Sequence, residues 1–335
     1  MSAHKYDTGR IVMSFTPELT RPDVVVRPLR RDDLPVADHI FRLAFGTFIG
    51  LPDPLAFAGD ADLIRPRYLA DPSATFGAEV DGELVGSNVV TSWGTVGFFG
   101  PLTVRPDHWD RGIAKLLLER TVELFEQWGI THAGLFTFAD SPKHIHLYQK
   151  FGFWPQFLTM IMSIPVRQTA TEASWTSYSE VPESQRGRLL SECRELTSAI
   201  YEGLDVEREI RAVDTQGLGD TVLLVDNSTP VGLAVCHCGP GSEAGSGMCY
   251  VKFGAVRPGP TAGTVFERLL DACEAFAAAR GASRLVCGVN TARHDAYRRM
   301  LARGFRANLT QGVVMARPNG PGYNRPDVYL IDDWR

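Results

Sequence analysis

The sequence has few of the features that mark disulfide-stabilised, secreted or membrane proteins. Its 335 residues include only six cysteines, the first of them Cys193, and none in C-x-x-C spacing, so we expect small buried thiols rather than a disulfide framework. No run of 18 apolar residues is present, and the first twenty residues lack the apolar core of a signal peptide. We therefore expect a cytoplasmic protein with no membrane partner.

One short segment, Cys236-His237-Cys238, contains the residue types that bind zinc. In a strand the two thiols share one face and the imidazole points to the other, so the three side chains cannot close on one ion. We expect no metal.

An excess of positive charge is also missing. The formal net charge is −5 and the isoelectric point is near 5.9, which argues against nucleic acid as a partner. The apolar content of 44% and the charged content of 22% are ordinary for a folded protein with a sizeable core. The length indicates about two domains.

The most informative segment runs from Leu102 to Leu118. An apolar strand ends at Val104-Arg105-Pro106, a polar turn follows, and apolar residues then recur at helical spacing from Ile113 to Trp128. The first amides of such a helix lack intrahelical partners and carry the positive end of its dipole, so they can bind a phosphate. Gly112, at the start of the helix, lets that phosphate approach the backbone.

A second motif follows about one helix and one strand later, at residues 144–153, which read HIHLYQKFGF. Together the two motifs resemble the signatures of the GNAT superfamily of acyl-CoA N-acyltransferases, V-x-P, a short turn and Q/R-x-x-G-x-G/A, followed by L-Y-x-K-x-G-F. Val104, Pro106, Gly112 and Ala114 match the first signature, and Trp109 stands at the Q/R position.

The resemblance implies that the first half of the chain binds acetyl-CoA as a co-substrate. Backbone groups at the strand end would pair with the amide-bearing arm, and the helix start would hold the pyrophosphate. Trp109 removes one polar phosphate contact and leaves the backbone contribution intact, while Ser141 either caps the next helix or contacts the cofactor. The expected cofactor-binding residues are Leu102, Thr103, Val104, Trp109, Asp110, Arg111, Gly112, Ile113, Ala114 and Ser141.

Several short segments of the first half recur 152 residues later in the second half. Val104-Arg105-Pro106 falls on Val256-Arg257-Pro258, and Gly152-Phe153 falls on Gly304-Phe305. A constant offset indicates an internal repeat. We therefore expect an α/β fold of the α+β type, with two tandem GNAT-like units that each have a mixed, mostly antiparallel sheet flanked by helices.

The units are expected over residues 1–164 and 175–335, with a loose arm at 1–22 and a linker at 165–174. By this offset Gly112 corresponds to Thr264, Ala114 to Phe266 and Tyr148 to Met300. The second unit therefore keeps the pattern of strands and helices but lacks the expected phosphate-binding and catalytic residues. We expect a catalytic first unit and a structural second one. Residues 328–331 resemble a strand that could pair with either unit.

Acyl transfer to an amine needs a base for the amine and an acid for the departing sulfur. Tyr148 is the expected acid, because the pKa of a phenol, near 10, exceeds that of a thiol, near 8.5. Many GNAT relatives have a glutamate on the strand before Leu102, but residues 97–100 here read Gly-Phe-Phe-Gly. Glu79 and His144 are the next candidates for the general base, and Asp140 is a third.

The loop at residues 46–60 is rich in glycine, proline and aromatic residues, and long irregular loops tend to be functional. Its side chains either cap the core or form the wall of an acceptor pocket, and the candidate substrate-binding residues are Phe48, Leu51, Asp53 and Phe57. The expected function is transfer of an acetyl group from acetyl-CoA to a primary amine of a small molecule. A non-catalytic acyl-CoA-binding or sensing protein and a protein N-acetyltransferase are the alternatives, and the sequence leaves monomer and homodimer both open.

Overall fold

The computed structural model describes residues 24–167 and 174–335, so the expected arm and most of the expected linker lie outside the described residues. The first half contains the strands and helices of a mixed α/β unit. These are β1 (Val24–Pro28), α1 (Leu34–Phe48), α2 (Arg65–Ala70), β2 (Thr75–Val80), β3 (Glu83–Trp93), β4 (Val96–Phe99), β5 (Thr103–Val104), α3 (Ile113–Gln127), β6 (His132–Phe138), α4 (Pro142–Gln149) and β7 (Trp154–Pro165).

The second half repeats this plan, apart from a short first strand and an added last one. Its elements are β8 (Thr176–Ser177), α5 (Glu183–Ser198), α6 (Glu207–Thr215), β9 (Gly219–Asp226), β10 (Thr229–Gly239), β11 (Gly245–Val256), α7 (Ala262–Ala279), β12 (Arg284–Asn290), α8 (His294–Arg303), β13 (Arg306–Arg317) and β14 (Leu330–Ile331). The segment expected to pair with either unit forms β14, which pairs with β11 of the second.

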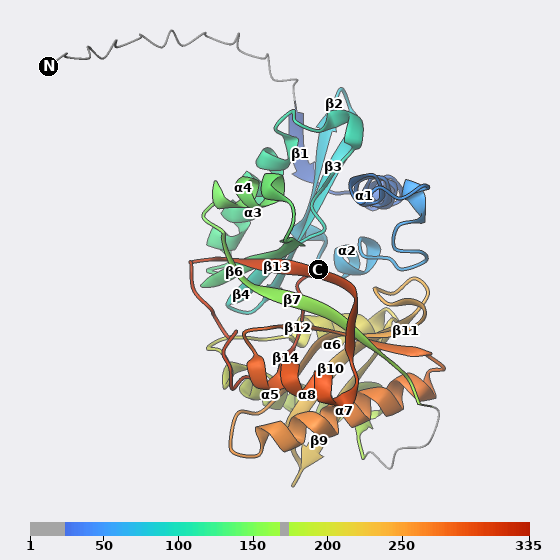
Figure 1. The fold of residues 1–335 in the computed structure, drawn as a ribbon, viewed down its shortest axis with the longest axis vertical. Helices are drawn as coiled ribbons and strands as arrows, with labels where there is room; N and C mark the ends of the chain where they lie inside the picture. Colours follow the sequence, from blue (N-terminus) through green and yellow to red (C-terminus); the bar gives the residue numbers. More distant parts are fainter. Residues whose placement is uncertain (1–23, 168–173) are drawn as a thin grey trace, which may run out of the picture.

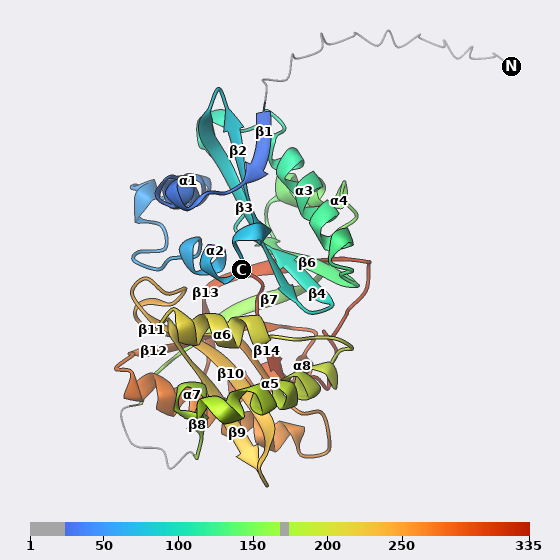
Figure 2. The same ribbon diagram turned by 180° about the vertical axis from the view of Figure 1, so that it is seen from behind.

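Helices cover both faces of the sheet in each half (Figures 1 and 2). Strands that are apolar at consecutive positions have two apolar faces, and both must be buried. Leu223 on β9 packs with α5 and α6, whereas its neighbours Val222 and Leu224 pack with α7. In the first half, α1 covers one face around Leu84 and Val89, and α3 covers the other.

The two halves exchange their last strands. β6 of the first half pairs with β13, β12 of the second half pairs with β7, and β13 and β7 lie side by side in the centre of one sheet (Figure 1). The strand order is β1-β2-β3-β4-β6-β13-β7-β12-β11-β10-β9-β8. Each half therefore completes its sheet with a strand from the other half.

The expected strand that ends at Val104 is interrupted. Val90 of β3 faces Phe99, and Ser87 faces Thr103, so three steps along β3 correspond to four along its partner. The extra residue is a β-bulge at residues 100–102, which bends the strand and divides it into β4 and β5.

Neither a metal site nor a membrane span is found in the described ranges. All six cysteines are free thiols, and no group of three or more His, Cys, Asp or Glu side chains in the described residues could hold a metal ion. Among the described helices, none combines the length and the apolar character that crossing a bilayer requires.

A buried ion-pair network joins the halves. Arg67 on α2 is 4% exposed, and its guanidinium donates to both carboxylate oxygens of Glu243, at 2.6 and 3.1 Å, and to the carbonyl oxygen of Gly100 in the bulge, at 2.7 Å. Lys252 Nζ lies 2.7 Å from Glu243 and 3.0 Å from Glu209. Burial alone would raise the pKa of Glu243, but the charges of Arg67 and Lys252 lower it well below its usual value.

We expect Arg67→Met to lower the free energy of unfolding by about 3–5 kcal/mol, because removing one partner leaves buried charge uncompensated. Urea denaturation measures this loss. Arg65→Met on the same helix is the control: its side chain is 59% exposed, so its change should stay within about 0.5 kcal/mol. Equal effects of the two substitutions would show that the network does not stabilise the join between the halves.

Candidate active site

Strands β4 and β6 run side by side and then separate. Their parallel pairing ends at Phe98 and Gly134. Beyond the bulge, β5 pairs with β3, while β6 continues to Phe138 and, within the described residues, pairs there with β13 alone. The sheet thus opens into a V-shaped gap between β5 and residues 135–138, which we call the first notch.

The start of α3 forms a cradle beside the first notch. Gly112 is the N-cap of α3, with φ of 80°, and no side chain caps the helix. A Cβ added at Gly112 would meet nothing within 4 Å, so the space in front of the first-turn amides is open. These amides carry the positive end of the helix dipole, so the cradle suits a phosphate.

Side chains fix the turn that leads into the cradle. The indole N–H of Trp109 donates to the carbonyl oxygen of Val104 at 2.7 Å, so this residue braces the turn against the strand that precedes it. Lys143, in the first turn of α4, lies 2.7 Å from Asp110 and 5.9 Å from the centroid of the Trp109 ring. Lys143 was not among the expected site residues, although a lysine in the first turn of the helix after β6 indicates positive charge beside the turn.

Tyr148 lies at the floor of the first notch. It is 7% exposed, and its ring centroid lies 5.8 Å from that of Phe99, the last residue of β4. Burial raises the pKa of its phenol well above the ordinary value, and a hydrogen bond with Thr137 on β6 opposes part of that rise. Tyr148 therefore spans the two diverging strands and stays protonated at neutral pH.

His144 lies one helical turn before Tyr148, at the end of the notch. Its ring centroid lies 4.8 Å from that of Phe48, which in turn lies 4.9 Å from that of Phe138. Burial and the nearby charge of Lys143 lower the pKa of His144. Its Nδ1 is buried and has no hydrogen-bond partner among the described residues.

Ser141 acts as a helix cap. Its hydroxyl oxygen accepts a hydrogen bond from the backbone N–H of His144 at 3.5 Å, at the start of α4. This contact leaves open whether Ser141 also reaches a cofactor.

Only part of the loop at 46–60 reaches the notch. Phe48 does so through Phe138 and His144, whereas Phe57 stacks on Phe45, with ring centroids 5.3 Å apart, and packs into the core under α1. Asp53 accepts a hydrogen bond from the backbone N–H of Leu55 at 3.1 Å, and Leu51 is half-buried.

Glu79 lies on the opposite face of the sheet from α4. Ala78 and Val80 on either side of it pack into the core under α3, so Glu79 points to the face that α1 covers, where it forms an ion pair with Arg27. The hydrogen bond from Arg27 lowers the pKa of Glu79. Asp140 is exposed in the turn between β6 and α4.

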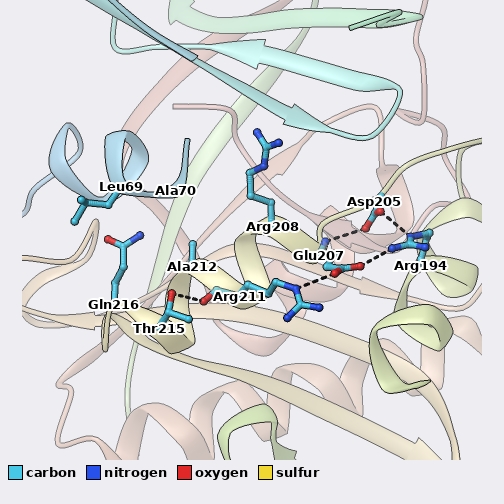
Figure 3. Close-up of a pocket in the computed structure, with 10 residues that line it drawn as sticks. All are labelled: Leu69, Ala70, Arg194, Asp205, Glu207, Arg208, Arg211, Ala212, Thr215 and Gln216. Carbon is cyan, nitrogen blue, oxygen red and sulfur yellow. Dashed lines mark hydrogen bonds and ion pairs between the residues drawn. The ribbon is translucent and has the colours of Figure 1, made fainter. Parts of the chain in front are cut away.

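A separate hollow of about 470 Å³ lies between α2 and α6 (Figure 3). Its arginines already have carboxylate partners: Arg194 lies 2.7 Å from Asp205, and Arg211 lies 2.8 Å from Glu207. None of the expected site residues lines it. The hollow is therefore distinct from the first notch.

Comparison with known proteins identifies this architecture. Residues 40–153 match the acetyltransferase (GNAT) family, and this range contains the bulge, the cradle and Tyr148. The first half of the chain therefore contains a domain of the GNAT acetyltransferase family. The two halves share a GNAT-like fold, and the first notch is the opening between the diverging strands of the first.

Solved structures share the fold of both halves of the chain. A putative acetyltransferase from Pyrococcus horikoshii has a TM-score of 0.66 at 16% identity, with 99% of each chain covered. A GCN5-related N-acetyltransferase from Sphaerobacter thermophilus has a TM-score of 0.56 at 16% identity, over 89% of this chain and 96% of that one. A tandem GNAT protein from the clavulanic acid biosynthesis pathway has a TM-score of 0.54 at 14% identity, over 89% and 99%. Among curated proteins, none matches the sequence.

We expect His144 to titrate below the ordinary histidine value of about 6.5, because burial disfavours the imidazolium. Since its pKa is then lower in the folded than in the unfolded state, this residue lowers the stability of the protein as the pH falls below about 6.5. NMR of the imidazole carbon-bound protons follows the titration. Lys143→Gln should raise the pKa of His144 by removing a like charge, and a wild-type titration at or above 6.5 would contradict the placement.

Proposed function

We propose that the first domain transfers an acetyl group from acetyl-CoA to a primary amine of a small molecule. One observation carries the proposal: beside the diverging strands β4 and β6 lie an uncapped helix start with open space at Gly112 and the buried, protonated phenol of Tyr148.

The residues at the notch fit an acyl-CoA. First-turn amides at residues 112–114 would hold the pyrophosphate. The backbone edge at Leu102–Val104 would pair with the amide-bearing arm. Acetyl-CoA supplies the acyl group in activated form, as a thioester.

Tyr148 and His144 divide the proton chemistry in this proposal. The phenol of Tyr148 keeps its proton at neutral pH and can give it to a departing sulfur, since its pKa exceeds that of a thiol. The lowered pKa of His144 keeps its imidazole neutral, so the ring can accept a proton from the amine, directly or through water. Glu79 is less suited, because it is ion-paired on the other face of the sheet.

The acceptor would lie at the end of the notch, against Phe48 and Phe138. These rings and His144 form an apolar wall with one titratable group. The turn from α1 to α2 folds back closely: a Cβ at Gly46 would lie 2.1 Å from the carbonyl oxygen of Pro54. Because the wall at this end is aromatic, we favour a small amine over a protein N-terminus.

An acceptor screen tests the function. The purified chain is given acetyl-CoA with a panel of small primary amines and, in parallel, with peptides that have free N-termini, and release of the free thiol is followed. We expect release above the hydrolysis rate with at least one small amine. Release with peptides alone would identify a protein N-acetyltransferase, and binding of acetyl-CoA without any transfer would favour the sensing alternative.

We predict that Gly112→Glu weakens acetyl-CoA binding at least about 100-fold, or about 2.7 kcal/mol, because it places a side chain and a negative charge in the cradle. Calorimetry measures the affinity. Gly129→Glu is the matched control: it lies at the other end of α3, also has a positive φ, 65°, and also has open space at its Cβ position. Equal affinities in the two variants would remove the cradle from the site.

We predict that Tyr148→Phe lowers the turnover number by about 10²–10⁴-fold, the usual loss when a positioned general acid is removed. The phenyl ring keeps the packing against Phe99, so acetyl-CoA affinity should change little. Steady-state kinetics and calorimetry separate these effects. Tyr297→Phe on α8 serves as the control, and turnover within a few-fold of wild type in Tyr148→Phe would show that Tyr148 is a packing residue.

A further inference from the structure

The second domain also has diverging strands. β11 and β12 pair in parallel from Met248 and Arg284 to Val251 and Cys287 and then separate. The 152-residue offset places Met248 and Arg284 on Val96 and His132, which begin the corresponding pairing in the first domain. We call this opening the second notch.

A segment of the same chain fills the second notch. Leu330 and Ile331 of β14 pair with Ala255 and Gly254 of β11. The backbone N–H of Val256 donates to the carbonyl oxygen of Tyr329 at 3.3 Å. By the offset, residues 254–256 correspond to 102–104, so a peptide occupies the strand edge at which the proposed function places the cofactor arm in the first domain.

The helix start is blocked as well. Phe266 corresponds to Ala114, and its ring centroid lies 5.5 Å from that of Tyr329. A Cβ at Gly263 would lie 2.9 Å from the hydroxyl oxygen of Tyr329, and the guanidinium of Arg299 lies 5.6 Å from the centroid of that tyrosine ring. An aromatic ring thus stands where the first domain has an open cradle.

Arg293, which corresponds to Ser141, anchors the inserted segment. It is 1% exposed, and its guanidinium donates to the carbonyl oxygen of Leu330 at 2.7 Å and to Asn324 Oδ1 at 2.9 Å, and forms an ion pair with Asp332. A buried guanidinium without these partners would be strongly unfavourable. The segment therefore cannot leave the notch without stranding a charge.

The segment then continues to the root of the first notch. The ring of Trp334 stacks on Phe98, with centroids 6.0 Å apart and planes at 3°, and a Cβ at Gly134 would lie 2.1 Å from the Trp334 ring. Phe98 and Gly134 form the last pair before β4 and β6 separate. The end of the chain lies between the two domains in both views (Figures 1 and 2).

We propose that residues 323–334, the closing segment, are a permanent intramolecular ligand of the second domain. The segment occupies the notch that corresponds to the acyl-CoA site of the first domain, so the second domain binds no acyl-CoA and instead holds Trp334 at the root of the first notch. The assignment of acyl-CoA to the first notch rests on the proposed function, whereas the seating of the closing segment does not.

Hydrogen exchange of the full chain, with and without saturating acetyl-CoA, tests the proposal. We expect the amides of residues 329–332 to be among the slowly exchanging ones, with no acceleration by acetyl-CoA, and calorimetry to give one acetyl-CoA per chain. Faster exchange in this segment on adding acetyl-CoA, or two molecules bound per chain, would overturn the proposal. If no acetyl-CoA binds, the proposed function fails, and the exchange without ligand still decides: slow exchange supports the seating and fast exchange overturns it.

Substitutions at the anchor sharpen the test. Arg293→Met should speed exchange of residues 329–332 at least about tenfold, whereas Arg298→Met, an exposed position on the same helix, should not. Tyr329→Ala removes a half-buried ring without stranding a charge, and it should speed exchange of the same amides if Arg293→Met does not fold. In Tyr329→Ala acetyl-CoA should still bind once per chain, because Leu330 and Ile331 continue to pair with the strand edge of β11. Unchanged exchange in Tyr329→Ala and in a folded Arg293→Met would show that these contacts do not hold the segment.

Discussion

Two strands that diverge within a sheet leave backbone N–H and C=O groups without partners, and the rest of this structure depends on how two such edges are used. Inside a protein an unpaired backbone group is costly. In the second domain β14 pairs with the edge at Gly254 and Ala255. In the first domain β5, after the bulge, pairs on one side with β3. No other described strand pairs with β5, which is the arrangement that the proposed acyl-CoA site needs.

The exchanged strands explain why the two domains act as one body. β13 completes the first domain beside β6, and β7 completes the second beside β12, so neither sheet is whole without the other domain. Arg67 adds a polar link, because one guanidinium holds both the Gly100 carbonyl of the bulge and Glu243 of the second domain. The shape of the first notch is therefore supported from the second domain.

The sequence predicted the repeated frame well, because apolar periodicity and the turn glycines are local signals. The constant offset correctly paired Val104 with Val256, but α7 begins at Ala262, about one turn before the position that corresponds to the start of α3. The exchange of β7 and β13 could not be predicted, since an apolar strand that is buried on both faces fits either neighbouring sheet equally well. The bulge at residues 100–102 was missed for a related reason: nothing in an apolar run shows which residue loses its partner.

Long-range contacts set the remaining details of the site. Trp109 is a departure from the family pattern, and its indole N–H braces the turn through Val104. Glu79 has a carboxylate suited to a base, but Arg27, 52 positions away, takes it as an ion-pair partner. Neither pairing has a signal in the local sequence. Phe48, by contrast, was found from loop composition alone and lies beside His144.

Corresponding positions give the two notches opposite chemistry. In the first domain small residues, Gly112 and Ala114, leave the helix start uncovered, which is the arrangement that the proposed anionic ligand needs. In the second domain the Tyr329 ring lies at the first turn of α7, where a Cβ at Gly263 would lie 2.9 Å from its hydroxyl oxygen, and Asp332 of the closing segment neutralises Arg293. A buried arginine that already has a carboxylate offers little to a pyrophosphate, whereas a free helix start offers several hydrogen bonds at once. The same frame therefore holds its own peptide on one side and stays open to a charged ligand on the other.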